Sequence, residues 1–302
     1  MREHWRVECR DGYRWNYVCC ETCRLIRLQL GPDSAVCEKV SYADDYYGGG
    51  FSKFSGAIQA LRELSADRRA RELNRFFLQP GRVVDIGCGE GLFLKSMKNL
   101  GWTVEGCEIG KKAADRAEQR LSQAIHRGQF ETLPRKKQPW DVVMLWHVLE
   151  HVENPELLLQ RIAADVSDNG LLVIGIPNAS SWQASLFGPY WFHLDPPRHL
   201  HSLRLEHLRS LAERAGWQVA DVRHFSLEYN PYGWAQSLLN CLGWKRDAMY
   251  ETLKRHDRVI PGGTALRMLA WMLLGPAIVP AVLEALVGRG GTVNAYLRKS
   301  KK

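Results

Sequence analysis

The chain has 302 residues, of which 45% are hydrophobic and 25% are charged, as in an ordinary globular protein. A chain of this length buries a core large enough to need no disulfide bonds, which excludes a small disulfide-stapled scaffold. Lysine and arginine exceed aspartate and glutamate by 8. Such a surplus favours anionic partners such as phosphorylated substrates, acidic lipids or nucleic acid. No long basic run concentrates it, so we interpret it as solvated surface.

Residues 1–50 are rich in cysteine, arginine and tyrosine and end in a glycine run, which indicates a joint. We therefore expect a small cysteine-rich head before a larger domain, 51–302. Thiolates of this head would suit a structural zinc site, and the candidates are Cys9, Cys20, Cys23 and Cys37. The C-x-x-C pair resembles the second half of a zinc ribbon whose first half is missing, so a metal-free head is the alternative. The first ten residues lack the apolar run of a secretory signal, and we expect a reducing, cytoplasmic compartment.

After the joint, helical and strand-like segments alternate, which is typical of a parallel sheet covered by helices. The predicted strands are 83–86, 102–108, 140–146, 171–176, 217–225 and 292–298. The predicted helices are 54–78, 91–100, 111–124, 156–166 and 205–215. The long segment 227–290 separates the last two strands. Structureless loops of such length are uncommon in compact domains, so we expect a helical insertion there.

The first predicted strand runs into a glycine-rich turn with the sequence V-V-D-I-G-C-G-E-G. Glycine is needed where the backbone turns sharply and a ligand must approach it without an intervening Cβ atom. The glycines are Gly87, Gly89 and Gly91, and Leu92 stands where an NAD-binding fingerprint requires its third glycine. Glu108 ends the next strand about twenty residues after the first glycine, where a carboxylate can accept hydrogen bonds from both ribose hydroxyls.

These residues resemble motif I of the class I S-adenosylmethionine-dependent methyltransferases, in particular type 23 and ubiquinone-pathway O-methyltransferases. The resemblance extends over 80–225. It implies a Rossmann-like α/β fold with a seven-stranded, mostly parallel sheet flanked by helices. It also implies S-adenosylmethionine as cofactor and S-adenosylhomocysteine as product. By resemblance Asp85, Gly87 and Gly89 hold the methionine end, and Glu108 holds the ribose.

The resemblance extends the cofactor site beyond the loop and Glu108. Phe130 lies where the family's third strand meets the adenine, so stacking on the adenine is one interpretation and burial in the core is the other. The further candidates for cofactor contact are Cys88, Gly91, Ile109 and Trp146.

Acceptors of open α/β sheets bind beyond the carboxyl ends of the strands. His147, Glu150 and His151 follow the predicted strand 140–146, and residues three and four apart share a face on a helical turn. Their convergence suits a base, a substrate contact or a divalent metal, and structural hydrogen bonding is the alternative. In some ubiquinone O-methyltransferases the matching segment binds a metal through two carboxylates and a histidine. Here His147 replaces the first carboxylate.

A second segment on this side, Y-W-F-H-L-D-P-P-R-H-L-H at 190–201, mixes aromatic and titratable residues with two stiffening prolines. A preformed acceptor pocket is often lined in this way. We expect His193, Asp195 and Arg198 to contact the acceptor, and a rigid loop in which the last two pair is the alternative. A hydroxyl acceptor must lose its proton near neutral pH, which suits histidine. The candidate catalytic residues are His151, His199 and His147.

We expect the helices of the insertion to cover the acceptor side of the sheet. Within the insertion, 268–283 contains no charged residue. Two prolines and a glycine interrupt this run, so we expect a broken helix pair that is too short to span a bilayer, which needs about twenty apolar residues. Core packing, self-association as a homodimer and shallow contact with the inner face of a membrane stay open. Arg267, Arg289 and Arg298 flank the run and would meet anionic headgroups in the last case.

Together the patterns predict transfer of a methyl group to a small-molecule or lipid-linked acceptor, on an oxygen of a sugar or glycan precursor or of a quinone-like metabolite. One alternative is a methyltransferase-like binding subunit without catalysis, against which the intact glycine loop and Glu108 argue. Another is an RNA methyltransferase, which the net charge favours. However, His147 follows Trp146 where many base-methylating enzymes carry an asparagine. We therefore expect no nucleic-acid partner.

Overall fold

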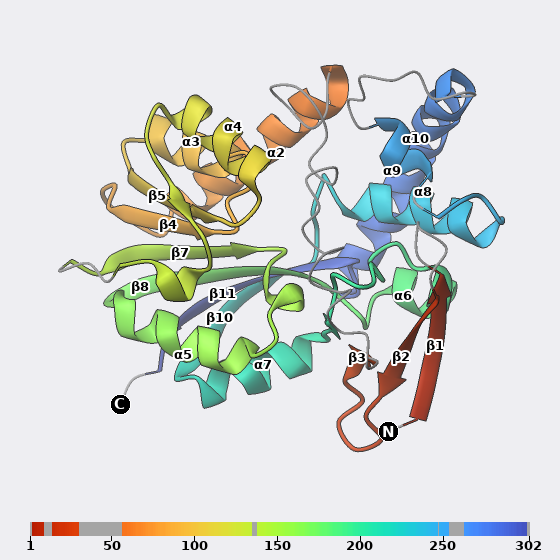
Figure 1. The fold of residues 1–302 in the computed structure, drawn as a ribbon, viewed down its shortest axis with the longest axis horizontal. Coiled ribbons are helices and arrows are strands. Elements are labelled where there is room, and N and C mark those ends of the chain that lie inside the picture. The colour runs from red at the N-terminus through yellow and green to blue at the C-terminus, as the bar shows by residue number, and fades with distance from the viewer. Residues whose placement is uncertain are drawn as a thin grey trace.

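The computed structural model describes residues 2–8, 14–29, 56–134, 138–246, 248–253 and 263–300. Its larger sheet is built from seven strands: β4 (Arg82–Ile86), β5 (Thr103–Glu108), β6 (His126–Arg127), β7 (Trp140–Trp146), β8 (Val166–Pro177), β10 (Trp217–Arg223) and β11 (Thr292–Lys299). They are arranged in the order β10-β11-β8-β7-β4-β5-β6 (Figure 1).

The strand order of this sheet reverses between β4 and β7. β5 and β6 lie on one side of β4, β7 and β8 lie on the other, and these five strands pair in parallel. β11 is antiparallel to both β8 and β10. Open α/β sheets bind ligands in the crevice beyond the carboxyl ends at such a reversal. The predicted Rossmann-like class, with its seven-stranded and mostly parallel sheet, is confirmed.

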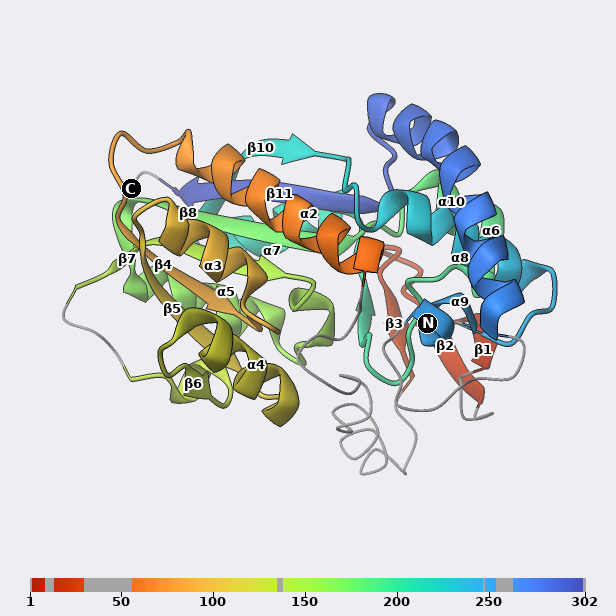
Figure 2. The same ribbon diagram turned by 90° about the horizontal axis from the view of Figure 1, so that it is seen from above.

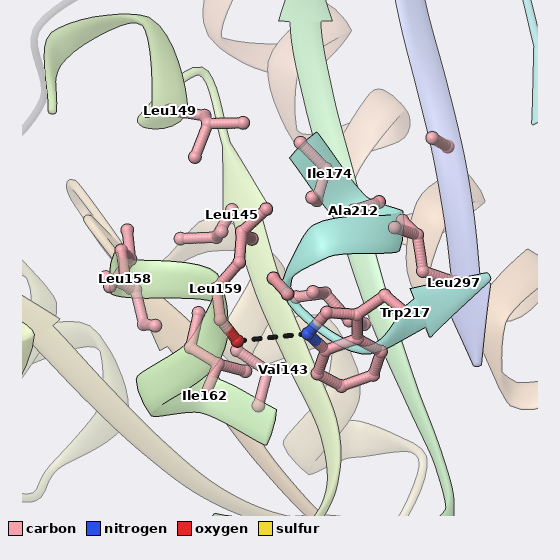
Figure 3. Packing of buried hydrophobic residues seen from close by; sticks show 14 of the residues in the cluster. Val143, Leu145, Leu149, Leu158, Leu159, Ile162, Ile174, Ala212, Trp217 and Leu297 are labelled. Carbon is pink, nitrogen blue, oxygen red and sulfur yellow. Dashed lines mark hydrogen bonds between the residues drawn. The ribbon is translucent and has the colours of Figure 1, made fainter. Parts of the chain in front are cut away.

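Helices cover both faces of the sheet (Figures 1 and 2). One face carries α2 (Gly56–Asn74), α3 (Leu92–Asn99) and α4 (Lys111–Leu121), and the other carries α5 (Pro155–Asp165) and α7 (Leu205–Arg214). The core under the second face includes the fully buried Trp217 (Figure 3). Its indole N–H donates to the Leu159 carbonyl at 3.0 Å, so burial leaves no donor unsatisfied.

The N-terminal head forms part of a second, four-stranded sheet. Its strands β1 (Arg2–Glu8), β2 (Arg14–Cys19) and β3 (Ile26–Leu28) pair in that order. β3 then pairs with β9 (His201–Ser202), which belongs to the larger domain. Head side chains also share a hydrophobic cluster with α6 (Trp182–Phe187) and with Trp191. The head is therefore joined through both its sheet and its core to the segment that follows β8.

The insertion before β11 is helical, as the sequence predicts, and contains α8 (Asn230–Cys241), α9 (Ala248–Leu253) and α10 (Gly263–Leu286). The expected break at its prolines is wrong, because Pro276 and Pro280 lie inside one continuous α10. Proline removes a backbone donor from a helix, but one side of α10 packs on α8, which supports the helix through both positions. The window Met268–Leu286 has a mean hydropathy of 1.8 with 22% of it buried, so by length and composition α10 could cross a membrane. A core helix of a soluble protein can pass the same test of length and composition.

Candidate active site

A cavity of about 660 Å³ opens at the carboxyl ends of β4, β5 and β7. One part of its wall is the glycine loop with Glu108. Another part is formed by 146–151 and 192–199, and the insertion closes the remaining side. The cavity thus lies at the reversal of strand order and joins the predicted cofactor and acceptor sides in one space.

The glycine loop adopts a backbone that other residues rarely accept. Gly87 and Gly89 have φ values of +72° and +55°, in the left-handed region that favours glycine. A Cβ at Gly87 would lie 2.6 Å from the Val148 side chain, whereas one at Gly89 would meet nothing within 4 Å. Gly91 also has a positive φ, and its Cβ would press on Ala117 of α4 at 3.2 Å. Gly87 and Gly89 line the cavity, while Gly91 lets two helices approach each other.

Glu108 ties the end of β5 to the glycine loop. Its carboxylate accepts hydrogen bonds from the amides of Gly89 at 2.9 Å and Gly110 at 2.7 Å. The side chain is only 4% exposed but belongs to the cavity wall. It therefore stands where the sequence predicts the ribose contact.

The other predicted cofactor residues fall into two groups. Ile109 and Trp146 line the cavity. Phe130 does not: it is 3% exposed and packs against Trp140 in the core, at 5.9 Å between ring centroids. This placement is the core alternative, and it gives no support to stacking of Phe130 on adenine. Cys88 is also buried in the core, where burial raises the pKa of its thiol.

Asp85, the last residue but one of β4, is a buried carboxylate, 4% exposed, and lies behind the glycine loop without lining the cavity. Its Oδ1 atom has no hydrogen-bond partner among the described residues. Burial raises the pKa of Asp85 to about 8, which Arg69 opposes and Glu108 reinforces. A buried carboxylate without a partner beside the glycine loop suits a cationic group, such as the ammonium of a bound methionine moiety.

On the acceptor side, a left-handed turn directs His147 toward Glu150. His147 has a φ of +54°, which is uncommon for residues other than glycine. Its Nδ1 lies 3.0 Å from the Glu150 carboxylate, which is 1% exposed. Burial alone would raise the Glu150 pKa, but the His147 hydrogen bond and the neighbouring histidines lower it to about 2. Glu150 is therefore an anion beneath the cavity.

Two further histidines are oriented by backbone carbonyls. His151 Nδ1 lies 2.9 Å from the Arg198 carbonyl, and His199 Nδ1 lies 2.6 Å from the His193 carbonyl. A carbonyl only accepts, so each Nδ1 carries the proton and each Nε2 is left as an acceptor. Burial, aided by His151, lowers the pKa of His199 to about 4. His199 is thus neutral near pH 7.

Glu150, His151 and His199 each place one ligand atom within 4.8 Å of the others. The set differs from the predicted trio because His199 from the second segment replaces His147. Two histidines held by carbonyls and one carboxylate form a donor set that suits a divalent transition metal. The same geometry also suits a proton acceptor next to an anion.

The remaining predicted acceptor residues also lie at the cavity. Arg198 Nε donates to Asp195 Oδ2 at 2.8 Å, so the paired loop that the sequence left open is observed, and both residues line the cavity. His193 is 3% exposed, and its Nε2 has no partner in the described part of the chain. Burial lowers its pKa well below the usual value for histidine. Contact of these three residues with the acceptor stays a prediction.

Sequence reasoning missed the part of the wall that α2 supplies, whereas the insertion covers the acceptor side as predicted. Tyr229 and Tyr232 come from the start of α8, and their rings approach His147 and Phe192. Three α10 side chains, Trp271, Leu274 and Ile278, close the same side. The apolar run 268–283 was the available signal, but it could not indicate which face of the helix would point inward.

The predicted zinc site gains no support. Cys20 is half-buried, Cys23 is exposed, and Cys9 and Cys37 lie outside the described residues. Among the residues that the structure describes, the one group with converging metal-ligand atoms is Glu150, His151 and His199.

Known proteins that resemble this chain in sequence include methyltransferases. The family described as a methyltransferase domain matches residues 59–222, which is more than half of the chain. A ubiquinone biosynthesis O-methyltransferase of Ralstonia nicotianae is 30% identical over 162 residues, which cover 50% of this chain and 67% of the relative. The enzyme of that name from Coxiella burnetii is 26% identical over 189 residues, 59% of this chain and 80% of the relative.

Solved structures agree in fold. A SAM-dependent methyltransferase from Archaeoglobus fulgidus has a TM-score of 0.51 at 19% identity and covers 82% of this chain and 96% of its own. The cyclase SpnF has a TM-score of 0.50 at 17% identity, covering 78% and 81%. Since a cyclase shares it, the fold alone does not define the reaction. The family match and the site carry that conclusion: the chain belongs to the methyltransferase-domain family and is a class I S-adenosylmethionine-dependent methyltransferase.

Proposed function

We propose that the protein methylates a hydroxyl oxygen of an apolar, lipid-linked or lipid-like acceptor, such as a quinone precursor or a lipid-linked sugar. The observation that carries the proposal is the double role of α10. Trp271, Leu274 and Ile278 of this helix line the active-site cavity. Met272 and Val279 of the same helix are 71% and 61% exposed.

An apolar helix that borders both solvent and active site suits a substrate that arrives from a membrane surface. Exposed apolar side chains that gather on one helix suit an interaction surface, and an interfacial helix lies with its apolar side in the headgroup region. Trp244 and Trp182 are also about half exposed on neighbouring elements, and tryptophan is enriched at membrane interfaces. The relatives named O-methyltransferases support oxygen as the acceptor atom.

The chemistry that the chain must supply is orientation and removal of one proton. S-adenosylmethionine, when bound, supplies a methyl group on a sulfonium, which reacts by in-line displacement. In this proposal the Nε2 atoms of His151 and His199 accept the proton of the acceptor hydroxyl, which is supported by the contacts of both Nδ1 atoms with backbone carbonyls. Glu150 would stabilise the resulting imidazolium. If a divalent metal occupies Glu150, His151 and His199 instead, it would supply Lewis-acid polarisation of the hydroxyl.

The first experiment measures transfer of labelled methyl groups to a panel of acceptors. The panel pairs hydroxylated quinone precursors with and without isoprenoid tails, and polyprenyl-linked sugars with free nucleotide sugars. We expect transfer to oxygen and a preference for the tailed member of a pair. Preference for the untailed members, or transfer to nitrogen, would contradict the proposal. Dialysis against a chelator separates the two proton-removal routes, because only the metal route loses activity.

The second experiment tests membrane contact by flotation with vesicles that contain anionic lipid. We expect the full chain to float, and the double variant Met272→Glu, Val279→Glu to stay in solution. The matched control is Leu78→Glu, Leu157→Glu, because these leucines are as exposed but lie away from α10. If the wild-type protein stays in solution, or if both double variants lose flotation alike, α10 is not the contact surface.

A further inference from the structure

A second cavity, of about 380 Å³, lies on the α2 face of the sheet beside the active site. Its walls come from α2, from β7, β8 and β11, from the end of β10 and the segment after it (223–227), and from the last turns of α10. Trp146 and Leu227 belong to the walls of both cavities and thus stand between them. The glycine loop and the histidines of the active site do not line this second space.

Polar atoms without partners surround the second cavity. Within the described part of the chain, five buried atoms of its lining side chains have no hydrogen-bond partner: Ser65 Oγ, Arg69 Nε, Trp146 Nε1, His224 Nδ1 and Asn294 Oδ1. Ser65 and Asn294 are only 5% and 7% exposed. A buried polar atom that is left unsatisfied destabilises the fold. Five around one cavity therefore indicate that the native occupant is polar on at least one side.

The types of these atoms define the polar side of the occupant. Arg69 Nε and Trp146 Nε1 can only donate, and they adjoin each other because the Arg69 guanidinium lies 4.2 Å over the Trp146 ring. The Ser65 hydroxyl can also donate. A group that satisfies all three must accept several hydrogen bonds, which a carboxylate or phosphate does best.

Charge and apolar surface complete the description. The lining includes the guanidinium groups of Arg68, Arg69 and Arg223 but a single carboxylate, Glu72, which is shared by Arg68 at 2.9 Å and Arg223 at 3.1 Å. Carboxylates outside the lining also pair with two of them, Asp221 with Arg223 at 3.2 Å and Glu228 with Arg69 at 3.5 Å. The rest of the lining is mainly apolar, with Leu73, Met144 and Val173 from α2 and the sheet, and Val282, Ala285 and Leu286 from α10. An occupant therefore presents an oxyanion toward the arginines and an apolar body toward the sheet and α10.

We propose that this cavity is a second small-molecule site, which binds an apolar compound carrying one oxyanion, separate from the cofactor and the acceptor. Carboxylates and phosphate monoesters share the required chemistry. Pocket size, orphaned donors and excess of arginine agree on this class. The site does not depend on the identity of the methyl acceptor, so it stands or falls separately from the proposed function.

Photo-crosslinking with 4-benzoylbenzoate tests the site, because this aromatic carboxylate labels the residues that it contacts. The full chain is saturated with S-adenosylhomocysteine, irradiated with the probe, and mapped by residue-level mass spectrometry. We expect adducts on α2 near Ser65 and on α10 near Val282 and Leu286. The uncharged 4-benzoylbenzamide is the matched probe and should label these positions at least tenfold less. Equal labelling by the amide, or adducts confined to 271–279, would overturn the proposal.

Two variants test the same site by calorimetric titration with the carboxylate. Ser65→Phe should fill the polar side and abolish binding, whereas Ser185→Phe, at an exposed position of α6, should bind as wild type. If Ser65→Phe does not fold, Arg223→Gln provides the second variant. It should weaken binding at least fivefold, with Arg214→Gln, an exposed arginine on the opposite face, as its control. Wild-type affinity in a folded Ser65→Phe or in Arg223→Gln would contradict the proposal.

Discussion

The two halves of the active site differ in how far apart their residues lie in the sequence. The cofactor half comes from one continuous stretch, the glycine loop through Ile109, and its requirements concern the backbone: positive φ and absence of a Cβ. The acceptor half joins 147–151, 192–199, the start of α8 and α10, and its requirements concern side chains. The first half is therefore sensitive to steric change at single positions, and the second to the chemistry and placement of groups from several segments.

The largest expected effect comes from Gly87→Leu in the cofactor half. The new side chain must adopt a left-handed φ and collide with Val148, because even a Cβ would lie 2.6 Å away. Binding of S-adenosylhomocysteine should become undetectable by calorimetry. The control is Gly216→Leu, since Gly216 also has a positive φ but a Cβ there would meet no atom within 4 Å. It should lower stability and keep the affinity; equal affinity in both variants would show that the loop does not hold the cofactor.

Loss of the histidines of the acceptor half should lower turnover and leave the affinity for the cofactor almost unchanged. His199→Ala and His151→Ala remove the two outward Nε2 atoms, and loss of a general base lowers the rate by about 10²-fold or more. Turnover on the methyl acceptor and cofactor affinity are measured side by side. His126→Ala is the control, because His126 lies on β6, away from the acceptor side, and its ring contacts the Thr132 hydroxyl. Unchanged turnover in both single variants would rule out proton transfer by these histidines.

The same contrast explains how much of the fold could be predicted. The strand 140–146 was placed at its observed bounds, since a run that is apolar apart from Asp141 and is buried on both faces leaves little freedom. The two-residue strands β6 and β9 were missed, because so short a segment carries no periodicity. The continuity of α10 was also missed, since local rules end a helix at proline and only packing on α8 overrides them.

Within the site, local motifs were predicted better than tertiary partners. Gly87, Gly89 and Glu108 lie at the cavity as expected. Phe130 was placed by its position in the chain, but a strand-end aromatic can turn into the core or into the cavity, and here it packs on Trp140. The convergence of His199 with Glu150 and His151 depends on a loop that returns across the sheet, which no spacing in the sequence reveals.

A smaller effect concerns the pH dependence of cofactor binding, which should arise in the cofactor half of the site. The pKa of Asp85 is raised to about 8 by burial, so the carboxyl is largely protonated at pH 7 without ligand. A cationic amino group binds the ionised form, so affinity for S-adenosylhomocysteine should rise about tenfold per pH unit below 8 and level off above it. Calorimetry in buffers of different ionisation enthalpy should detect a released proton near pH 7. Asp85→Asn should bind weakly and without this slope, and a wild-type profile flat from pH 6 to 8 would contradict the assignment.

The smallest expected effect concerns the N-terminal head. The head contacts the acceptor half of the active site through His199. The Tyr17 hydroxyl donates to the His199 carbonyl at 3.0 Å, and the ring is fully buried where the head packs on the loop of Trp191. Tyr17→Phe removes this hydrogen bond, worth about 1 kcal/mol, and keeps the packing.

Because 1.4 kcal/mol corresponds to a factor of ten, kcat/KM for the acceptor should fall about fivefold in Tyr17→Phe while cofactor affinity is unchanged. Tyr190→Phe, at an exposed ring nearby, should retain wild-type kinetics. Titrating the fraction of folded protein in each sample distinguishes positioning from simple loss of stability, since the latter lowers cofactor-binding capacity and kcat together. A Tyr17→Phe variant with wild-type kcat/KM would show that the head supports the acceptor loop by packing and strand pairing, without this hydrogen bond.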